Sequence, residues 1–271
     1  MGPSRFSEQE VTPGRIISGI VRRVGDVPEM LTWRFSSRAE KNRAKITQFR
    51  DLHAGKRCVV IANGPSLGSV NLIPLKNEWT IGMNRIYLHF PKMGFETSYY
   101  VAINDLVINQ FKDEISTLKM PKFLNWNLRN LFSTNAPRTN YLKTNLGLQD
   151  EFSKDICKPI SSGGTVTFVA LQLAYYMGFN EVVLIGLDHR FASSGTPNKV
   201  ERRDNSKDES HFHPGYFPPG SRWQLPDLRR SELAYEKARR AFEADGRRIL
   251  DATEDGACQV FEKVKYSSLF K

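Results

Sequence analysis

The sequence predicts an α/β fold, with a mostly parallel sheet and helices on both of its faces. Two observations predict it. Short apolar runs, typical of buried strands, alternate along the 271-residue chain with segments of helical pattern. The runs also stop at polar residues, as strands of an open parallel sheet do where they border a crevice. Strands and helices that alternate in this way build a parallel sheet.

The predicted strands begin at residues 58–62, which run into the turn Asn63-Gly64-Pro65-Ser66. The next runs are residues 79–83, 99–103 and 181–187. They stop at Asn84, at Asn104-Asp105 and at Asp188-His189. A last strand is predicted at residues 248–252.

Two segments carry clear helical patterns. Residues 163–177 place apolar side chains nearly all round a helical wheel, which predicts a helix buried in the middle of the fold and ended by Gly178. Residues 231–242 form an amphipathic helix that starts at Ser231 and ends near Asp245-Gly246.

Residues 1–50 are more basic than acidic, and we expect them to form a basic helical extension that adds little to the core. A short amphipathic helix is predicted from apolar residues at helical spacing beside three arginines: Ile16, Ile17, Ile20, Val21 and Val24, with Arg15, Arg22 and Arg23. Such a helix packs on the domain or an oligomer partner, or contacts a membrane surface. Residues 51–271 are predicted to form the nucleotide-binding domain. Residues 192–230, rich in Ser, Gly and Pro, are predicted to form a long lid loop.

Composition narrows the function classes. The net charge of +10, from 39 Lys and Arg against 29 Asp and Glu, favours anionic partners such as nucleotides, phospholipids, anionic glycans or nucleic acid. Three widely spaced cysteines without a C-x-x-C pair, and no signal-peptide pattern, indicate neither disulfides nor a zinc ribbon and favour the cytoplasm. No window approaches the roughly 18 apolar residues of a membrane-spanning helix.

The turn after the first strand is the first candidate site, because its glycine lets backbone N–H groups approach an anion. Its spacing differs from G-x-G-x-x-G and from the phosphate loop, so neither classical site is expected. Asn84 and Asn104 can each donate and accept, as reading a nucleobase edge or a ribose requires. For all of these residues a plain turn is the alternative.

The second candidate is Ser161-Ser162-Gly163-Gly164-Thr165, where free N–H groups at the start of the buried helix suit a phosphate or a carboxylate. A simple helix cap is the alternative. A general base with a pKa near 7 would come from His189, His211 or His213. The sequence has no D-x-D, H-E-x-x-H or G-x-S-x-G motif, and we predict no metal site.

Several of these motifs, in this order, resemble a known family. They are ANGPSL at 62–67, the SSGGT helix start, GLDH at 186–189, HFHPGYF at 211–217, and ILDAT with VFEKVKYSSLF near the end. The order is similar to that of the MptE-like group, named after archaeal 6-hydroxymethylpterin diphosphokinase. It is also similar to bacterial sialyltransferases that use CMP-sialic acid and to flagellin nonulosonic acid glycosyltransferases. The resemblance covers roughly residues 56–270 and implies a Rossmann-like, sialyltransferase-like fold, a variant of the GT-A class.

The resemblance also implies roles for the candidate residues. Asn63, Gly64 and Ser66 would line the CMP phosphate and ribose, and Asn84 and Asn104 would reach the nucleotide or sugar. Ser162, Gly163 and Gly164 would contact the sugar carboxylate and phosphate. His211, with His213 as second choice, would deprotonate the acceptor hydroxyl, and Tyr216 would stabilise the leaving phosphate. Hydroxyl and backbone donors can replace a metal because a nucleoside monophosphate carries less charge than a diphosphate.

The resulting hypothesis is a glycosyltransferase of bacterial surface-glycan biosynthesis. It would transfer a CMP-activated nonulosonic or sialic-type acid to a glycan or lipid-linked acceptor without an essential metal, in the cytoplasm or at the inner membrane face. The alternative is an ATP- and Mg²⁺-dependent diphosphokinase acting on a pterin, with Asp105 and Asp188 near the phosphates. A nucleic-acid-binding module is disfavoured because the excess charge lies in residues 1–50 and not among aromatics on a sheet face. The oligomeric state stays open.

Overall fold

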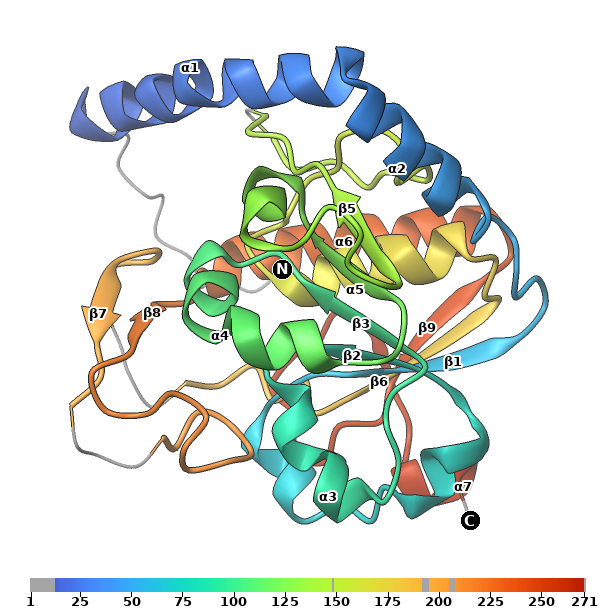
Figure 1. Ribbon diagram of the computed structural model, residues 1–271. Helices are drawn as coiled ribbons and strands as arrows, with labels where there is room; N and C mark the ends of the chain where they lie inside the picture. The colour runs from blue at the N-terminus through green and yellow to red at the C-terminus, as the bar shows by residue number, and fades with distance from the viewer. Residues whose placement is uncertain (1–12, 148, 192–194, 205–207, 271) are drawn as a thin grey trace, which may run out of the picture.

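A parallel sheet forms the centre of the molecule (Figure 1). The computed structural model describes residues 13–147, 149–191, 195–204 and 208–270, with side chains at Val21 and from Arg23 onward. The sheet has eight strands in the order β10-β9-β6-β1-β2-β3-β4-β5. Every neighbouring pair is parallel. The strands are β1 (Arg57–Ile61), β2 (Trp79–Met83), β3 (Tyr99–Ala102), β4 (Lys122–Asn125), β5 (Thr139–Leu142), β6 (Glu181–Ile185), β9 (Arg248–Asp251) and β10 (Glu262–Lys263).

The central strands are buried because their sequences are apolar on both faces. Four of the five residues are buried in each of β1, β2 and β6. The predicted strands at 58–62, 79–83, 99–103, 181–187 and 248–252 are confirmed to within two residues at each end. The order of strands reverses at β1, which pairs with β2 on one side and with β6 on the other.

Helices cover both faces of the sheet, as predicted. Figure 1 shows α5 (Val166–Tyr176) and α6 (Leu228–Ala244) on one side, with α3 (Phe90–Met93) and α7 (Tyr266–Leu269) on the other. Short 3-10 turns fill several connections: η1 (Pro65–Gly68), η2 (Ile73–Asn77), η3 (Ile86–His89) and η4 (Trp126–Leu131). None of the helices in the described part of the chain is long and apolar enough to cross a membrane.

The two predicted helices are present, and the predicted start of each was wrong: α5 begins at Val166 and not at Gly163, because Thr165 is its N-cap. Helix α5 is buried from Thr167 to Tyr176, and Gly178 ends it at φ +88°, a left-handed conformation that suits glycine. Helix α6 begins at Leu228 and not at Ser231. The reason is that Asp227 is the N-cap and accepts a hydrogen bond from the Arg230 N–H (3.1 Å), so Ser231 lies inside the first turn.

The sequence analysis missed the elements between residues 104 and 145. They are α4 (Asp105–Thr117), strand β4 and the edge strand β5. Both strands are fully buried although they contain Lys122, Thr139 and Asn140. The Lys122 side chain is buried, and its ammonium donates a hydrogen bond to the Leu118 carbonyl, which partly offsets the cost of burying the charge.

The N-terminal segment contributes to the core, contrary to expectation. Helices α1 (Pro13–Phe35) and α2 (Ser37–Thr47) place Trp33, Ala39 and Ile46 in the interior. Asn42 explains why α2 packs there, because its side chain exchanges two hydrogen bonds of 2.8 Å with the backbone of Tyr141. It thereby satisfies the free edge of β5, as a neighbouring strand would. The predicted side-chain pattern at Ile16, Ile17 and Ile20 lies outside the described side chains.

The segment predicted to be a long lid loop contains regular secondary structure and buried side chains. Its described residues include an antiparallel pair, β7 (Val200–Arg202) with β8 (Arg222–Gln224). Tyr216, Phe217 and Trp223 are buried. Aromatic side chains at irregular spacing therefore close this segment onto the domain, and periodicity alone did not reveal them. Residues 192–194 and 205–207 lie outside the described part.

Candidate functional site

A cavity of about 470 Å³ opens where the carboxyl ends of the strands meet. Its walls come from the segments that follow β1, β2, β3, β4 and β6, from the start of α5 and α6, and from the predicted lid. The cavity adjoins the reversal of strand order at β1 and β6, which is where open parallel sheets bind ligands. Twelve of the predicted site residues line it: Asn63, Gly64, Asn84, Asn104, Asp105, Ser162, Gly164, Thr165, Asp188, His189, His211 and Tyr216.

Pro65 and Ser66 lie in the first turn but do not line the cavity. Ser66 is bound to Asp188, whose two carboxylate oxygens accept from the Ser66 N–H (3.1 Å) and hydroxyl (2.7 Å). The Gly64 N–H donates to the Gly186 carbonyl (2.9 Å). Asp188 therefore holds the turn after β1 against the turn after β6, across the point where strand order reverses.

Gly64 is required by close packing within the protein. A Cβ at this position would overlap the Asp188 carboxylate and come 2.7 Å from the Gly186 carbonyl oxygen. The sequence analysis attributed the glycine to a ligand. In the structure, the close contact between the turns after β1 and β6 by itself requires a glycine at position 64.

Two strand-end asparagines that line the cavity each carry a buried side-chain oxygen without a hydrogen-bond partner among the described residues. The Asn63 amide donates to the Met83 carbonyl (3.2 Å), while its Oδ1 is buried and has no hydrogen-bond partner among the described residues. Asn84 adopts φ +49°, and its buried Oδ1 likewise lacks a partner within the described chain. A buried carbonyl oxygen without a donor costs free energy, so both favour a ligand that supplies N–H or O–H groups.

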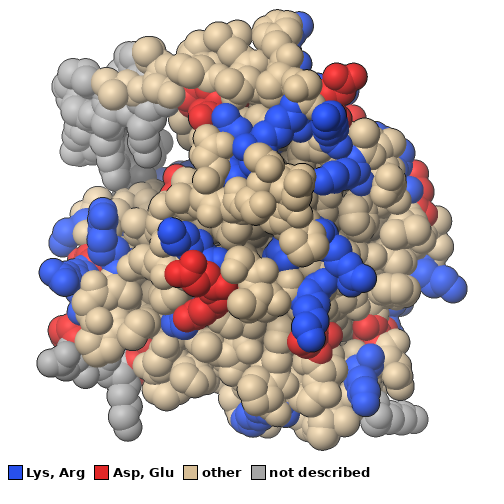
Figure 2. Space-filling model, viewed as in Figure 1, with Lys and Arg blue, Asp and Glu red and all other residues tan. Residues whose placement is uncertain are grey.

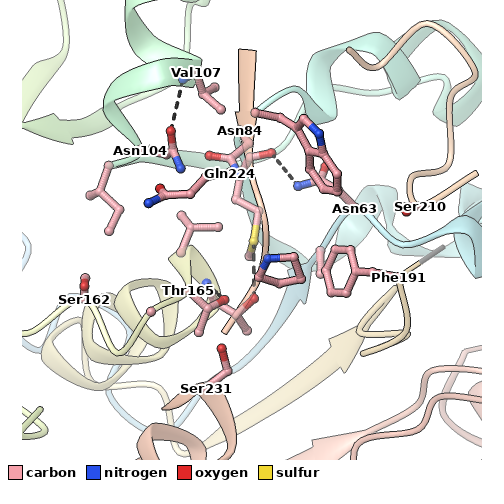
Figure 3. Close-up of a pocket in the computed structure, with 18 of the residues that line it drawn as sticks. Asn63, Asn84, Asn104, Val107, Ser162, Thr165, Phe191, Ser210, Gln224 and Ser231 are labelled. Carbon is pink, nitrogen blue, oxygen red and sulfur yellow. Dashed lines mark hydrogen bonds between the residues drawn. The ribbon is translucent and has the colours of Figure 1, made fainter. Parts of the chain in front are cut away.

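Asn104 and Asp105 have local partners. Asn104 is the N-cap of α4 and accepts from the N–H groups of Leu106 (2.9 Å) and Val107 (3.2 Å), a capping role that the sequence analysis did not predict. Asp105 accepts from the Asn125 amide (2.8 Å). Burial raises the pKa of Asp105, and this hydrogen bond only partly offsets the effect. Figure 3 shows Asn63, Asn84 and Asn104 arranged around one space, with Ser162 and Thr165 near the start of α5.

The turn before α5 is built around an ion pair that the sequence analysis missed. Arg230 contacts both oxygens of Asp150 (2.6 and 2.9 Å), and Asp150 also accepts from the Gly163 N–H (3.1 Å). Burial opposes ionisation of Asp150, but the hydrogen bond and charge of Arg230 outweigh it and lower the pKa. Arg230 lines the cavity and brings a cation beside Ser162 and Gly164.

Ser161 and Gly163 support this turn from outside the cavity lining. Ser161 is buried, and its hydroxyl accepts from the Glu151 N–H (3.0 Å). Gly163 has φ +60°, and a Cβ there would come 2.6 Å from the Phe168 ring. Thr165 is the N-cap of α5, with its hydroxyl accepting from the Thr167 N–H (3.3 Å).

His211 and Asp208 form a close pair at the lid side of the cavity. The His211 Nδ1 lies 3.0 Å from both carboxylate oxygens of Asp208, and the imidazole stacks on Tyr216 with ring centroids 4.0 Å apart. Burial raises the pKa of Asp208, but the hydrogen bond and charge of His211 outweigh it, so the pKa lies below its usual value. An ionised Asp208 orients the ring and leaves Nε2 as the nitrogen that can accept a proton.

The other predicted catalytic residues have different surroundings. The Tyr216 hydroxyl is buried and accepts a hydrogen bond from the Arg85 N–H (3.2 Å). Burial raises the pKa of this hydroxyl well above its usual value, and the hydrogen bond only partly offsets the effect. His189 has φ +54° and its Nε2 lies 3.2 Å from Glu232. Burial lowers the pKa of His189, and the nearby Glu232 carboxylate only partly offsets this. His213 is outside the lining and accepts from the Gly215 N–H.

No group of three or more His, Cys, Asp or Glu side chains gathers in metal-binding geometry within the part of the chain that the structure describes. All three cysteines are free.

A sequence model described as 6-hydroxymethylpterin diphosphokinase MptE-like matches residues 35–194, which is more than half of the chain. The chain belongs to the MptE-like family. The match begins inside α1, close to the start of α2. No curated protein matches the sequence.

Among solved structures, this MptE-like protein is similar to the Maf glycosyltransferase from Magnetospirillum magneticum AMB-1. The TM-score is 0.50 at 11% sequence identity, and the match covers 86% of this chain and 39% of the other. The MptE-like chain thus spans about two fifths of the length of that protein. At this identity the likeness concerns the Rossmann-like fold.

Proposed function

We propose that this MptE-like protein is a glycosyltransferase that uses a CMP-activated sugar of the nonulosonic or sialic type. The observation that carries the proposal is the His211–Asp208 pair on the wall of a cavity at the point where strand order reverses. An imidazole oriented by a carboxylate is the usual arrangement of a general base. A transferase that activates an acceptor hydroxyl needs such a base.

The cavity wall suits a sugar-nucleotide co-substrate that is negatively charged and also carries N–H or O–H groups. The unpaired Oδ1 atoms of Asn63 and Asn84 suit the amino group of cytosine or the hydroxyls of ribose and sugar. At the start of α5, Arg230 and the turn at Ser162 and Gly164 suit a carboxylate or phosphate, because cationic and backbone N–H donors favour anions.

The proposed step is a direct displacement. The Nε2 of His211 takes the proton of the acceptor hydroxyl while that oxygen forms a bond to the anomeric carbon. The bond from the anomeric carbon to the phosphate oxygen breaks, and CMP leaves with the bonding electrons. Asp208 stabilises the imidazolium that forms. The product has inverted configuration at the anomeric carbon.

Ligand-dependent thermal unfolding tests the nucleotide. CMP, CDP, CTP, UDP, GDP, ADP and ATP are each added at about 1 mM with Mg²⁺ or with EDTA. A ligand at 100 times its dissociation constant stabilises the fold by about 2.7 kcal/mol, a rise in midpoint of roughly 5–10 °C. We expect cytidine nucleotides to raise the midpoint in EDTA. No shift with any cytidine nucleotide contradicts the proposal.

The second candidate is an ATP- and Mg²⁺-dependent diphosphokinase, as the family description suggests. Asp105 and Asp188 both line the cavity and could approach a magnesium–phosphate group. However, both oxygens of Asp188 already accept hydrogen bonds from Ser66. A shift with ATP alone that disappears in EDTA would favour this candidate over the first.

A further inference from the structure

The outward face of α1 is apolar and uncovered. Its exposed side chains recur at intervals of three or four residues and therefore share one side of the helix: Val21 (63% exposed), Val24 (64%), Val27 (51%), Leu31 (52%) and Phe35 (72%). The opposite side carries Asp26 and Trp33, which are buried against the domain. We call these five residues the α1 apolar face.

Nowhere else in the described structure do so many exposed large apolar side chains lie on one helix. The other large apolar side chains that are exposed in the described structure come from scattered elements: Leu52, Ile73, Trp79, Leu131, Leu146, Val200 and Leu233. Single exposed apolar residues need no explanation, whereas a contiguous stripe on one helix marks an interaction surface.

The helix is firmly attached on its inner side. The buried Lys143 ammonium contacts both carboxylate oxygens of Asp26 (2.7 and 2.8 Å), and Trp33 packs edge-on against Trp126 with centroids 5.1 Å apart. Folding α1 inward to cover its apolar face would break this buried ion pair, which is costly. The α1 apolar face is therefore held on the outside of the domain.

Basic charge accompanies the face. Residues 13–50 contain three acidic residues and nine basic ones: Arg15, Arg22, Arg23, Arg34, Arg38, Lys41, Arg43, Lys45 and Arg50. Two of the acidic residues, Asp26 and Glu29, already pair with Lys143 and Arg129. Figure 2 shows uncharged surface along the upper edge, where Figure 1 places α1, with Lys and Arg side chains gathered beside it.

We propose that the α1 apolar face docks on an anionic membrane surface. The helix would lie in the plane of the headgroups, with its valine, leucine and phenylalanine side chains at the acyl boundary and the exposed Arg34, Lys41 and Lys45 near lipid phosphates. A second copy of the chain fits less well, because it would bring two strongly basic segments together in a molecule that already carries a net charge of +10.

Docking would also bring the cavity close to the membrane. The Arg23 side chain of α1 donates to the carbonyls of Leu146 (2.8 Å) and Gly147 (3.3 Å), and Leu146 lines the cavity. Under the proposed transferase function this position suits a lipid-linked acceptor. The docking itself does not depend on that function.

Vesicle sedimentation with the full chain tests the inference. The vesicles are phosphatidylcholine alone, or phosphatidylcholine with about 30% phosphatidylglycerol. We expect the protein to sediment with the anionic vesicles only. In the double variant V24D/L31D, the fraction of protein that sediments with the anionic vesicles should fall by about tenfold or more. I73D is the matched control, because Ile73 is equally exposed (62%) but lies in η2, outside the α1 apolar face.

Light scattering and unfolding midpoints accompany the sedimentation. If the unfolding midpoint of V24D/L31D is unchanged, its loss of vesicle binding is due to the altered surface and not to misfolding. The R34E/K41E variant tests the contribution of basic charge, and we expect it also to bind the anionic vesicles less. Equal sedimentation of V24D/L31D and the unsubstituted protein overturns the inference, as does equal binding to neutral vesicles. A dimer that V24D/L31D converts to a monomer, without vesicle binding, assigns the face to a second copy and also overturns it. Nucleotide-induced stabilisation is read separately, so failure here leaves the proposed function untouched.

Discussion

At the scale of single residues, the His211–Asp208 pair is the arrangement on which the proposed chemistry depends. Replacing His211 with alanine should lower turnover by about 10²-fold or more, because the general base is lost, while leaving nucleotide affinity nearly intact. Steady-state kinetics and nucleotide-induced thermal shifts measure the two effects. H213A is the control, since His213 lies two residues away and outside the cavity lining. An unchanged rate in H211A rejects the assignment.

The Asp150–Arg230 pair predicts a dependence of stability on pH. The pKa of Asp150 is lower in the folded state than its ordinary value of 3.8, so ionisation of this carboxyl stabilises the fold. Its contribution is complete above about pH 4 and is lost as the pH falls through the folded-state pKa.

Denaturant titrations of the D150N variant and the unsubstituted protein between pH 7 and pH 3 measure this contribution. We expect D150N to be the less stable at pH 7, and the difference should narrow below about pH 4. A difference that stays constant down to pH 3 would show that Asp150 does not act through its charge.

At the scale of elements, the meeting of the turns after β1 and β6 gives the site its shape. In G64A the new Cβ collides with the Asp188 carboxylate and the Gly186 carbonyl, so the two turns must separate. We expect a loss of about 1–3 kcal/mol in the free energy of unfolding together with weaker nucleotide binding.

Gly68 offers a control at the end of η1, the short helix of which Gly64 is the N-cap. Nothing lies within 4 Å of a Cβ added at Gly68, so G68A should change stability by less than about 1 kcal/mol and leave binding intact. Thermal unfolding of both variants with and without nucleotide makes the comparison. Equal behaviour of G64A and G68A would contradict the role assigned to the contact.

The same elements show what sequence patterns reveal. Buried parallel strands such as β1 and β6 are uninterrupted apolar runs, and their ends had to share one edge of the sheet, so Asn63, Asn84 and Asp188 could be grouped before the structure was known. Strand β5 was missed because Thr139 and Asn140 interrupt its apolar pattern, and because the partner of its backbone edge is Asn42 of α2, about a hundred positions earlier in the chain. Asp150 and Arg230 were missed for the same reason, since only folding brings them together. For Asp208 the signal was present, an acid three residues before a histidine, but weak.

At the scale of the whole molecule, the N-terminal helices and the sheet form one packed unit. The basic segment was expected to be an appendage, yet α2 covers the edge of β5 and α1 fixes Lys143 through Asp26. An uncovered β5 would expose backbone groups to water and to other chains. Removing residues 1–50 should therefore destabilise the sheet.

Asn42 tests this integration with a single side chain. In N42A the buried N–H and carbonyl of Tyr141 lose their partners, which should cost about 2–4 kcal/mol because each unsatisfied buried group carries its own desolvation penalty. K45A, exposed on the same helix, should stay within about 0.5 kcal/mol of the unsubstituted protein. Chemical denaturation measures both variants. If N42A is as stable as K45A, α2 does not act as the partner of the sheet edge; if it unfolds in one step at lower denaturant, the N-terminal helices and the sheet fold as one cooperative structure.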